Sequence, residues 1–252
     1  MAVPAYVTVL TVGILTAVVF AVTVVLSSAR GRAAARAGVP EAVGVTLLAW
    51  LGASAALSLA GVYRATPGAA IPALPVAFLI GLSGVWIAVT TIPSLRALIE
   101  QPATQTSLVT IQVGRVVGAV FLILLTRGQL PPLFALPAGL GDIATGLAAP
   151  FVARRLHEPG GRSSALIWNM FGLLDLVVAL ALGATINPGP GQLFPTTPSA
   201  VPTTEFPLAL IPAFYVPLSM VLHILSLRYL LGARTASAGG TVLPVAHLDP
   251  GR

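Results

Sequence analysis

The sequence predicts an all-α, polytopic membrane protein with seven transmembrane helices, and three observations support that prediction. Hydrophobic residues make up 56% of the 252 residues and charged residues only 8%, whereas soluble domains contain about 25% charged residues. Apolar runs close to the ~20 residues needed to cross a bilayer recur along the chain. The basic residues, all of which are arginine, stand mainly in the connections between those runs.

A single helical bundle accounts for most of the chain. The predicted bundle covers residues 1–234, and its spans lie at about residues 3–26, 41–63, 74–92, 107–126, 133–153, 164–186 and 206–230. Residues 235–252 begin with a Gly/Ser/Ala-rich stretch, which predicts a flexible cytoplasmic tail.

The first three spans are defined by the residues at their ends. No basic residue precedes the first span, whereas Arg30, Arg32 and Arg36 follow it. A cleaved signal peptide has the opposite order of charge, so we expect a retained helix with its N-terminus outside. The second span follows Glu41 and has small residues at four-residue spacing, which favours close packing. Pro93 ends the third span, and the SLRALIE segment after it is expected at the membrane interface.

The last four spans contain polar residues within apolar sequence. The fourth has Arg115 at its centre, and the fifth has Asp142. The sixth contains Asn169 and Asp175, and the seventh contains His223. The Pro/Thr-rich connection before the seventh span is expected to lack regular structure for most of its length. It either covers a cavity or simply joins two helices, and its composition favours a connection.

The arginines determine the predicted orientation. With the N-terminus outside, ten of the 13 basic residues lie on the cytoplasmic side, two lie outside and Arg115 lies within the membrane. This distribution follows the positive-inside rule, so we expect a cytoplasmic C-terminus and anionic lipids at the cytoplasmic face. Because the arginines flank apolar spans instead of forming a solvated basic domain, we expect no nucleic-acid partner.

An arginine in the middle of a membrane span requires partners, because placing it there costs roughly 2.5 to 3.5 kcal/mol. At about 1.5 Å of rise per residue, two aspartates share its level near the midplane, and three other polar residues lie roughly 7 to 9 Å nearer the cytoplasm. The predicted ligand- or proton-binding site consists of the midplane group, Arg115, Asp142 and Asp175, and the second group, Gln112, Asn169 and His223.

Helical spacing places these residues on defined faces. On the fourth span, Gln112, Arg115 and Gly118 share one face. The seventh span has a polar stripe at the same kind of spacing, formed by Tyr215, Ser219, His223 and Ser226. The sequence leaves open whether Arg115 pairs with Asp142 or with Asp175. Since one arginine cannot neutralise two aspartates, the second carboxyl is available for a proton, a cation or an amine.

Three functions are compatible with this pattern. The first, which we favour, is a protein that binds or transports a small ligand or a proton between spans four and seven. The second is a membrane enzyme, or a haem or other cofactor protein, that uses His223. The third is a non-catalytic subunit, in which the Arg/Asp pair only locks the helices together and which can belong to an oligomer. The sequence favours a non-enzymatic protein and gives no group of metal ligands.

Known families provide four comparisons. The Gly81–Gly84 run GLSG resembles the GxSG of rhomboid proteases, but the other catalytic residues of that family have no counterpart. The seven-helix topology resembles that of microbial rhodopsins, whose retinal is bound to a lysine; this chain has no lysine, so a retinal Schiff base is excluded. Ceramidase-type hydrolases need a zinc site of three histidines, and only His223 lies in a predicted span.

The fourth comparison concerns spans five and six. The runs LPAGLGDIATGLAAP and WNMFGLLDLVVALALG resemble those of uncharacterised bacterial integral-membrane proteins. That resemblance implies a multi-pass protein of the bacterial plasma membrane and implies no activity.

Overall fold

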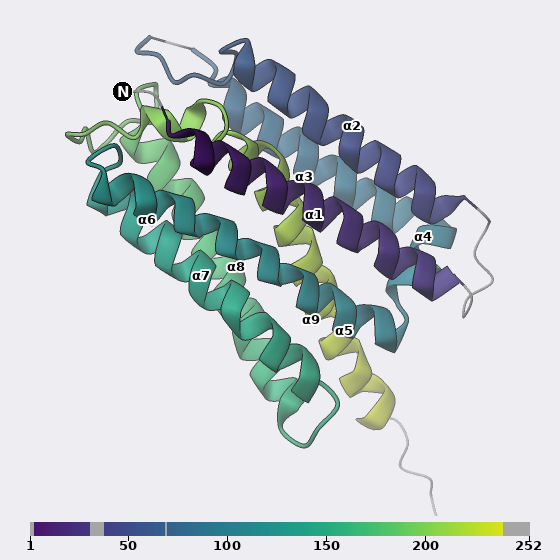
Figure 1. The fold of residues 1–252 in the computed structure, drawn as a ribbon. Coiled ribbons are helices and arrows are strands. Elements are labelled where there is room, and N and C mark those ends of the chain that lie inside the picture. Colours follow the sequence, from purple (N-terminus) through teal and green to yellow (C-terminus); the bar gives the residue numbers. More distant parts are fainter. Residues whose placement is uncertain (1–2, 31–37, 69, 239–252) are drawn as a thin grey trace, which may run out of the picture.

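The computed structural model describes residues 3–30, 38–68 and 70–238, and in these residues the chain forms helices joined by turns and loops (Figure 1). Seven of the helical segments are long and apolar enough to cross a membrane, which confirms the predicted seven-helix architecture. The elements in chain order are α1 Ala5–Arg30, α2 Val39–Leu59, α3 Ala73–Thr91, α4 Pro93–Ile99, α5 Pro102–Ile111, η1 Gln112–Gly118, α6 Ala119–Thr126, α7 Pro132–Arg155, α8 Gly161–Ile186, η2 Val201–Thr204, η3 Ile211–Tyr215 and α9 Val216–Ala238.

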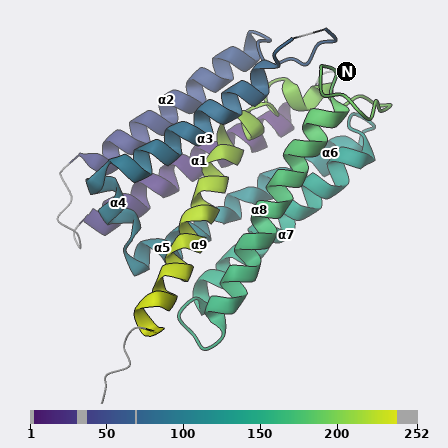
Figure 2. The ribbon, with the colours of Figure 1, turned by 180° about the vertical axis from the view of Figure 1, so that it is seen from behind.

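The spans form two groups with α9 between them. Helices α1, α2 and α3 lie on one side, and α6, α7 and α8 lie on the other, as both ribbon views show (Figures 1 and 2). Helix α9 packs against α3 of the first group and α8 of the second, and α5 also contacts it. The last span therefore connects two halves of the bundle.

Two of the spans begin five residues away from their predicted first residue. The fourth begins at Pro102 instead of residue 107, because proline suits the first turn of a helix, where its missing N–H is not needed. The seventh begins near Ile211 instead of residue 206, since residues 206–209 form turns. Helix α9 continues to Ala238, past the predicted end of the bundle at residue 234. The rest of the predicted tail, residues 239–252, lies outside the described residues.

The two ends of the bundle differ in composition. We call the end formed by residues 60–68, 70–73, 127–131 and 187–210 the Pro-rich end, and the end formed by residues 92–101, 154–162 and 228–232 the Arg-rich end. The start of α1 lies at the Pro-rich end, where Arg127 contacts the Tyr6 hydroxyl at 3.5 Å. At the opposite end, Arg162 donates a hydrogen bond to the carbonyl of Leu230. The first helix therefore starts at one end of the bundle and the last helix finishes at the other, as an odd number of spans requires.

The exterior of the bundle is apolar. Phe20, Ile80 and Leu174 are 70%, 69% and 62% exposed although each lies in the middle part of a long helix. Fully buried positions, by contrast, include Arg115, Asn169 and His223. This distribution is the reverse of that in a soluble protein and is expected for a bundle that is surrounded by lipid.

The fourth and seventh spans each depart from α-helical geometry near the centre of the bundle. Residues Gln112–Gly118 form a 3₁₀ segment between α5 and α6, and Ile211–Tyr215 form a π-turn that leads into α9. Pro212 and Pro217 lack the N–H groups that a regular helix would use there, which explains part of the irregularity in the seventh span. Such irregular turns inside helices are frequent at functional sites.

Candidate functional site

Arg115 is the centre of a buried ion cluster. Its side chain is fully buried, and both Nε and Nη2 approach Oδ1 of Asp142, at 2.8 and 2.7 Å. Nη2 also donates to Oδ2 of Asp175, and Nη1 donates to the carbonyl of Gly172 at 2.8 Å. The sequence left open which aspartate pairs with Arg115, and the structure places both against the same guanidinium.

The 3₁₀ segment explains how Arg115 reaches these partners. A 3₁₀ helix has three residues per turn, so side chains three residues apart lie directly above one another. Gln112, Arg115 and Gly118 are spaced in this way, and all three are buried. The face predicted from α-helical spacing therefore exists, and the tighter winding aligns its members more closely.

Three glycines make room for the cluster. A Cβ atom added at Gly118 would lie 2.6 Å from Oδ2 of Asp142, and one at Gly141 would lie 1.8 Å from Oδ1 of Asp175. At Gly172 the added atom would meet Nε2 of His223 at 2.7 Å and Nη1 of Arg115 at 3.1 Å. The small residues of these spans thus allow charged side chains, as well as backbones, to approach closely.

His223 joins the second predicted group to the first. Its Nε2 lies 3.3 Å from Nη1 of Arg115, and its Nδ1 lies 2.9 Å from Oδ1 of Asn169. Since a guanidinium can only donate, Nε2 is the acceptor, and the hydrogen assigned to Nδ1 is donated to Asn169. The imidazole is therefore a neutral tautomer with both nitrogens engaged by protein. The ring of Trp168 lies 5.0 Å from that of His223.

Two further pairs of polar side chains join neighbouring spans to α9. Asn169 donates from Nδ2 to the hydroxyl of Ser226 at 3.0 Å. Gln112 and Ser219 bond reciprocally, since Gln112 Nε2 donates to the Ser219 carbonyl at 3.1 Å and the Ser219 hydroxyl donates to Gln112 Oε1 at 2.8 Å. Asn169 thus belongs to the network centred on Arg115, whereas Gln112 forms a separate link between η1 and α9.

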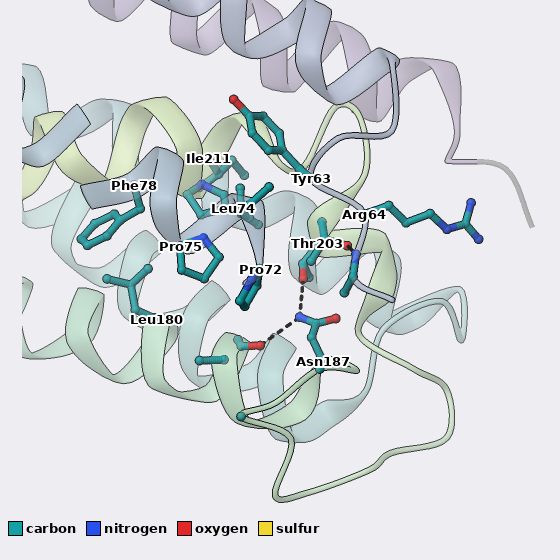
Figure 3. A pocket seen from close by; sticks show the side chains of 18 of the residues that line it. Tyr63, Arg64, Pro72, Leu74, Pro75, Phe78, Leu180, Asn187, Thr203 and Ile211 are labelled. Atoms are coloured by element: carbon teal, nitrogen blue, oxygen red, sulfur yellow. Dashed lines mark hydrogen bonds between the residues drawn. The ribbon is translucent and has the colours of Figure 1, made fainter. Parts of the chain in front are cut away.

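A cavity of about 400 Å³, which we call the main cavity, opens between the two halves of the bundle at the Pro-rich end (Figure 3). Its walls come from the start of α3, the end of α8 and the π-turn, and they are mainly apolar, as Phe78, Leu180 and Ile211 illustrate. Asp142 also lines it. Since Asp142 lies ten residues into α7, about 15 Å from the Pro-rich end, it marks the deep end of the cavity.

The mouth of the main cavity is formed by the two Pro-rich connections. Asn187 donates from Nδ2 to the hydroxyl of Thr203 at 3.1 Å, and its Oδ1 has no hydrogen-bond partner among the described residues (Figure 3). The hydroxyl of Thr204 accepts from the N–H of Ala65 at 2.9 Å, which ties the two connections together. Arg64 points away from the cavity and pairs with Glu205 at 3.0 Å.

Sequence reasoning missed the walls and mouth of the main cavity. The connection at residues 187–205 was expected mainly to join helices, but it also lines the cavity. Asn187 could have been found from the sequence. It directly precedes Pro188, which marks the end of a span, and a polar side chain at that position is expected at the membrane interface.

The residues proposed for other chemistries are not brought together. Ser83 of the GLSG run is exposed on α3, whereas His223 is fully buried. Gly81 of the same run packs instead against Trp50, whose ring atom would lie 2.3 Å from an added Cβ. In the part of the chain that the structure describes, no group of three or more His, Asp or Glu residues is arranged to bind a metal ion.

Comparison with known proteins gives one family. A family model described as Domain of unknown function (DUF8737) matches residues 71–231, which run from the start of α3 through most of α9. Every residue of the ion cluster and of the network around it lies inside the matched region. No curated protein and no solved structure matches this chain.

Proposed function

The chain belongs to the DUF8737 family, and we propose that it binds a small, largely apolar amine in the main cavity and exchanges the amine for a proton. The observation that supports this function most strongly is the double position of Asp142. The same carboxylate belongs to the ion cluster of Arg115 and to the wall of the main cavity. A ligand in the cavity therefore contacts the charged centre of the bundle.

The charge of the cluster favours a cationic ligand. Arg115 contributes one positive charge, and Asp142 and Asp175 contribute two negative charges when both are ionised, which leaves a net charge of minus one. A buried net charge is costly, so the cluster takes up one positive charge from elsewhere. In the empty protein this charge is a proton on one of the carboxyl groups, and in the complex it is the ammonium group of the ligand.

The walls of the main cavity favour an apolar body with a polar end. Phe78, Phe121 and Phe134 contribute aromatic side chains to the lining. The polar lining includes two acceptors, the Asp142 carboxylate at the deep end and Asn187 Oδ1 near the mouth. Its volume of about 400 Å³ falls within the range of small-molecule sites. An arylalkylamine meets these requirements, because its ring packs against apolar walls and its ammonium group donates to Asp142.

The position of the cavity also suits a transport step. It opens at the Pro-rich end, and its deep end meets a network that continues through His223 and Asn169 to Ser226. Both irregular segments, the 3₁₀ segment of the fourth span and the π-turn of the seventh, border this junction. Turns of this kind are places where a helix can bend or rewind, so they provide hinges for opening the site to the other side.

Ligand selectivity in lipid nanodiscs tests the proposed function. Isothermal titration calorimetry at pH 7 compares three probes with the same phenyl body: phenethylamine, the neutral 2-phenylethanol and the anionic 3-phenylpropionate. We expect the amine to bind at least about tenfold more tightly than the alcohol, because a charge-assisted hydrogen bond contributes roughly 1.5 to 3 kcal/mol. We expect the anion not to bind.

Two variants provide the matched comparison. Asp142→Asn keeps the shape of the side chain and removes its charge, so we expect amine binding to weaken to the level of the alcohol. Glu205→Gln removes a carboxylate that faces Arg64 outside the cavity and should leave binding unchanged. Equal binding of amine and alcohol by the unaltered protein would count against the proposal, and so would unchanged amine selectivity in Asp142→Asn.

A further inference from the structure

A second cavity lies at the opposite end of the bundle and is unrelated to the main cavity. It has a volume of about 480 Å³ and lies between α3, α4, α5 and α9. We call it the Arg-rich-end pocket. Its apolar lining includes Val89 and Leu225, and its polar lining includes both cationic and acceptor groups. Since the transmembrane helices end here, the pocket lies at the level of the lipid headgroups.

Gln105 provides a buried acceptor without a partner. Its side chain is only 2% exposed, and its Nε2 donates to the carbonyl of Ile99 at 2.7 Å. Its Oε1 has no hydrogen-bond partner in the described part of the chain. Buried carbonyl oxygens are almost always hydrogen-bonded, so this oxygen indicates a donor from a bound molecule.

Charged groups of both signs line the same pocket as this acceptor. Arg96 pairs through Nε with Oε1 of Glu100 at 2.8 Å, and both side chains are exposed, at 59% and 63%. The guanidinium of Arg228 lies 5.4 Å from the centre of the Trp86 ring, a cation–π contact that leaves its N–H groups available to a ligand. The pocket therefore offers two guanidinium groups for an anion and two acceptors, Glu100 and Gln105 Oε1, for a donor.

We propose that the Arg-rich-end pocket binds a phospholipid with a phosphoethanolamine headgroup. The phosphate lies against Arg228 and Arg96, and the primary ammonium donates to Gln105 Oε1 and Glu100. The acyl chains leave along the apolar side of the pocket into the bilayer. A choline headgroup has the same charges but no N–H, so it cannot satisfy Gln105. The hydroxyl groups of a phosphoglycerol headgroup can donate hydrogen bonds to Gln105 Oε1. That lipid has no ammonium group, however, so it offers no positive charge to Glu100.

Native mass spectrometry tests this proposal on the full chain. The protein is released from nanodiscs that contain equal amounts of dioleoyl-phosphatidylethanolamine, dioleoyl-phosphatidylcholine and dioleoyl-phosphatidylglycerol, and the retained lipids are counted. We expect phosphatidylethanolamine to be retained about fivefold more often than either of the others, which is the effect of one additional hydrogen bond. Equal retention of phosphatidylethanolamine and phosphatidylcholine, or preferred retention of phosphatidylglycerol, would overturn the proposal.

Variants of exposed residues locate the retained lipid. Glu100→Gln should reduce the preference for phosphatidylethanolamine to near parity, because it removes the charge that faces the ammonium group. Arg228→Gln should instead lower the retention of all three lipids, because it removes a contact to the phosphate that they share. Both positions are exposed enough to be changed without unfolding the bundle. Arg154→Gln and Glu158→Gln change the same charges at the same end of the bundle but outside the pocket, and should leave the preference intact. An unchanged preference in Glu100→Gln, or unchanged total retention in Arg228→Gln, would refute the assignment.

A competition experiment separates the lipid from its soluble headgroup. An excess of glycerophosphoethanolamine presents the same phosphate and ammonium without acyl chains. We expect the lipid to remain bound, because the apolar walls of the pocket contribute to its affinity. Complete displacement would identify the soluble headgroup as the ligand and contradict the lipid assignment.

Discussion

Oδ1 of Asp142 accepts a hydrogen bond from Nε of Arg115 and lies 2.7 Å from Nη2, while the same aspartate lines the deep end of the main cavity. A ligand that reaches Asp142 therefore competes with, or adds to, the interaction that holds the most deeply buried charge in place. This relationship links the stability of the bundle to the occupancy of its cavity.

Arg115→Gln should strongly destabilise the bundle. The change leaves Asp142 and Asp175 without their shared cation, and breaking one partner of a buried ion pair typically costs about 3 to 5 kcal/mol. The free energy of unfolding, measured by denaturant titration in mixed micelles, reports the loss. Arg64→Gln is the matched control, because the Arg64–Glu205 pair is largely exposed and should contribute no more than about 1 kcal/mol. Similar losses of unfolding free energy in both variants would contradict the claim that Arg115 stabilises the two buried carboxylates.

Gly141→Ala should displace Asp175 from the guanidinium. An added Cβ would lie 1.8 Å from Oδ1 of Asp175, so either the carboxylate or the contact between α7 and α8 must move. We expect a loss of about 1 to 3 kcal/mol, as for an overpacked core. Gly52→Ala is the control, since no atom lies within 4 Å of the added Cβ and alanine suits a helix better than glycine. Equal unfolding midpoints for the two variants would contradict this account of the glycine.

Ser219→Ala should have a small effect on stability. It removes the hydroxyl that donates to Gln112 Oε1 but leaves the backbone carbonyl that accepts from Gln112 Nε2. Hydrogen bonds between membrane helices contribute about 0.6 kcal/mol on average and at most about 1.7 kcal/mol in double-mutant cycles. Denaturant titration of Ser219→Ala, Gln112→Leu and the double variant measures this coupling. A coupling energy indistinguishable from zero would show that the pair adds no stability.

Asn187→Leu should weaken amine binding less than Asp142→Asn does. Asn187 Oδ1 lies near the mouth and offers an uncharged acceptor, whereas Asp142 offers a charge at the deep end. We expect a loss of about fivefold in phenethylamine affinity, equivalent to one neutral hydrogen bond. Thr66→Val, at another lining position, provides a control for changes in the polarity of the mouth. A larger loss for Asn187→Leu than for Asp142→Asn would place the ammonium group at the mouth instead.

The sequence predicted much of the architecture because long apolar runs and mid-membrane charges are strong signals. Residue counting along each span put Arg115, Asp142 and Asp175 at one level, and the structure brings them into contact. The same counting placed His223 nearer the cytoplasm than Arg115 and so did not predict that the two side chains meet. They do meet, because the long arginine side chain spans the distance between the two groups of residues. The 3₁₀ winding of Gln112–Gly118 also has no clear signature in the sequence.

The main cavity was not predictable for a different reason. It lies between the start of α3 and the end of α8, two helices that each pack against α9. Such a space depends on how helices cross, and hydrophobic patterning specifies which residues are buried but not which helices remain apart. Asn187 and Thr203 were therefore seen only as parts of a connection.

Proton release on amine binding tests the central claim most directly. Calorimetric titration of phenethylamine at pH 7, repeated in buffers with different enthalpies of ionisation, gives the number of protons exchanged per bound amine. The account predicts a release of about one proton, and by linkage an amine affinity that rises up to about tenfold per pH unit while that proton is bound. Asp142→Asn should abolish the release. Tight amine binding with no proton released, by the unaltered protein, would contradict the account.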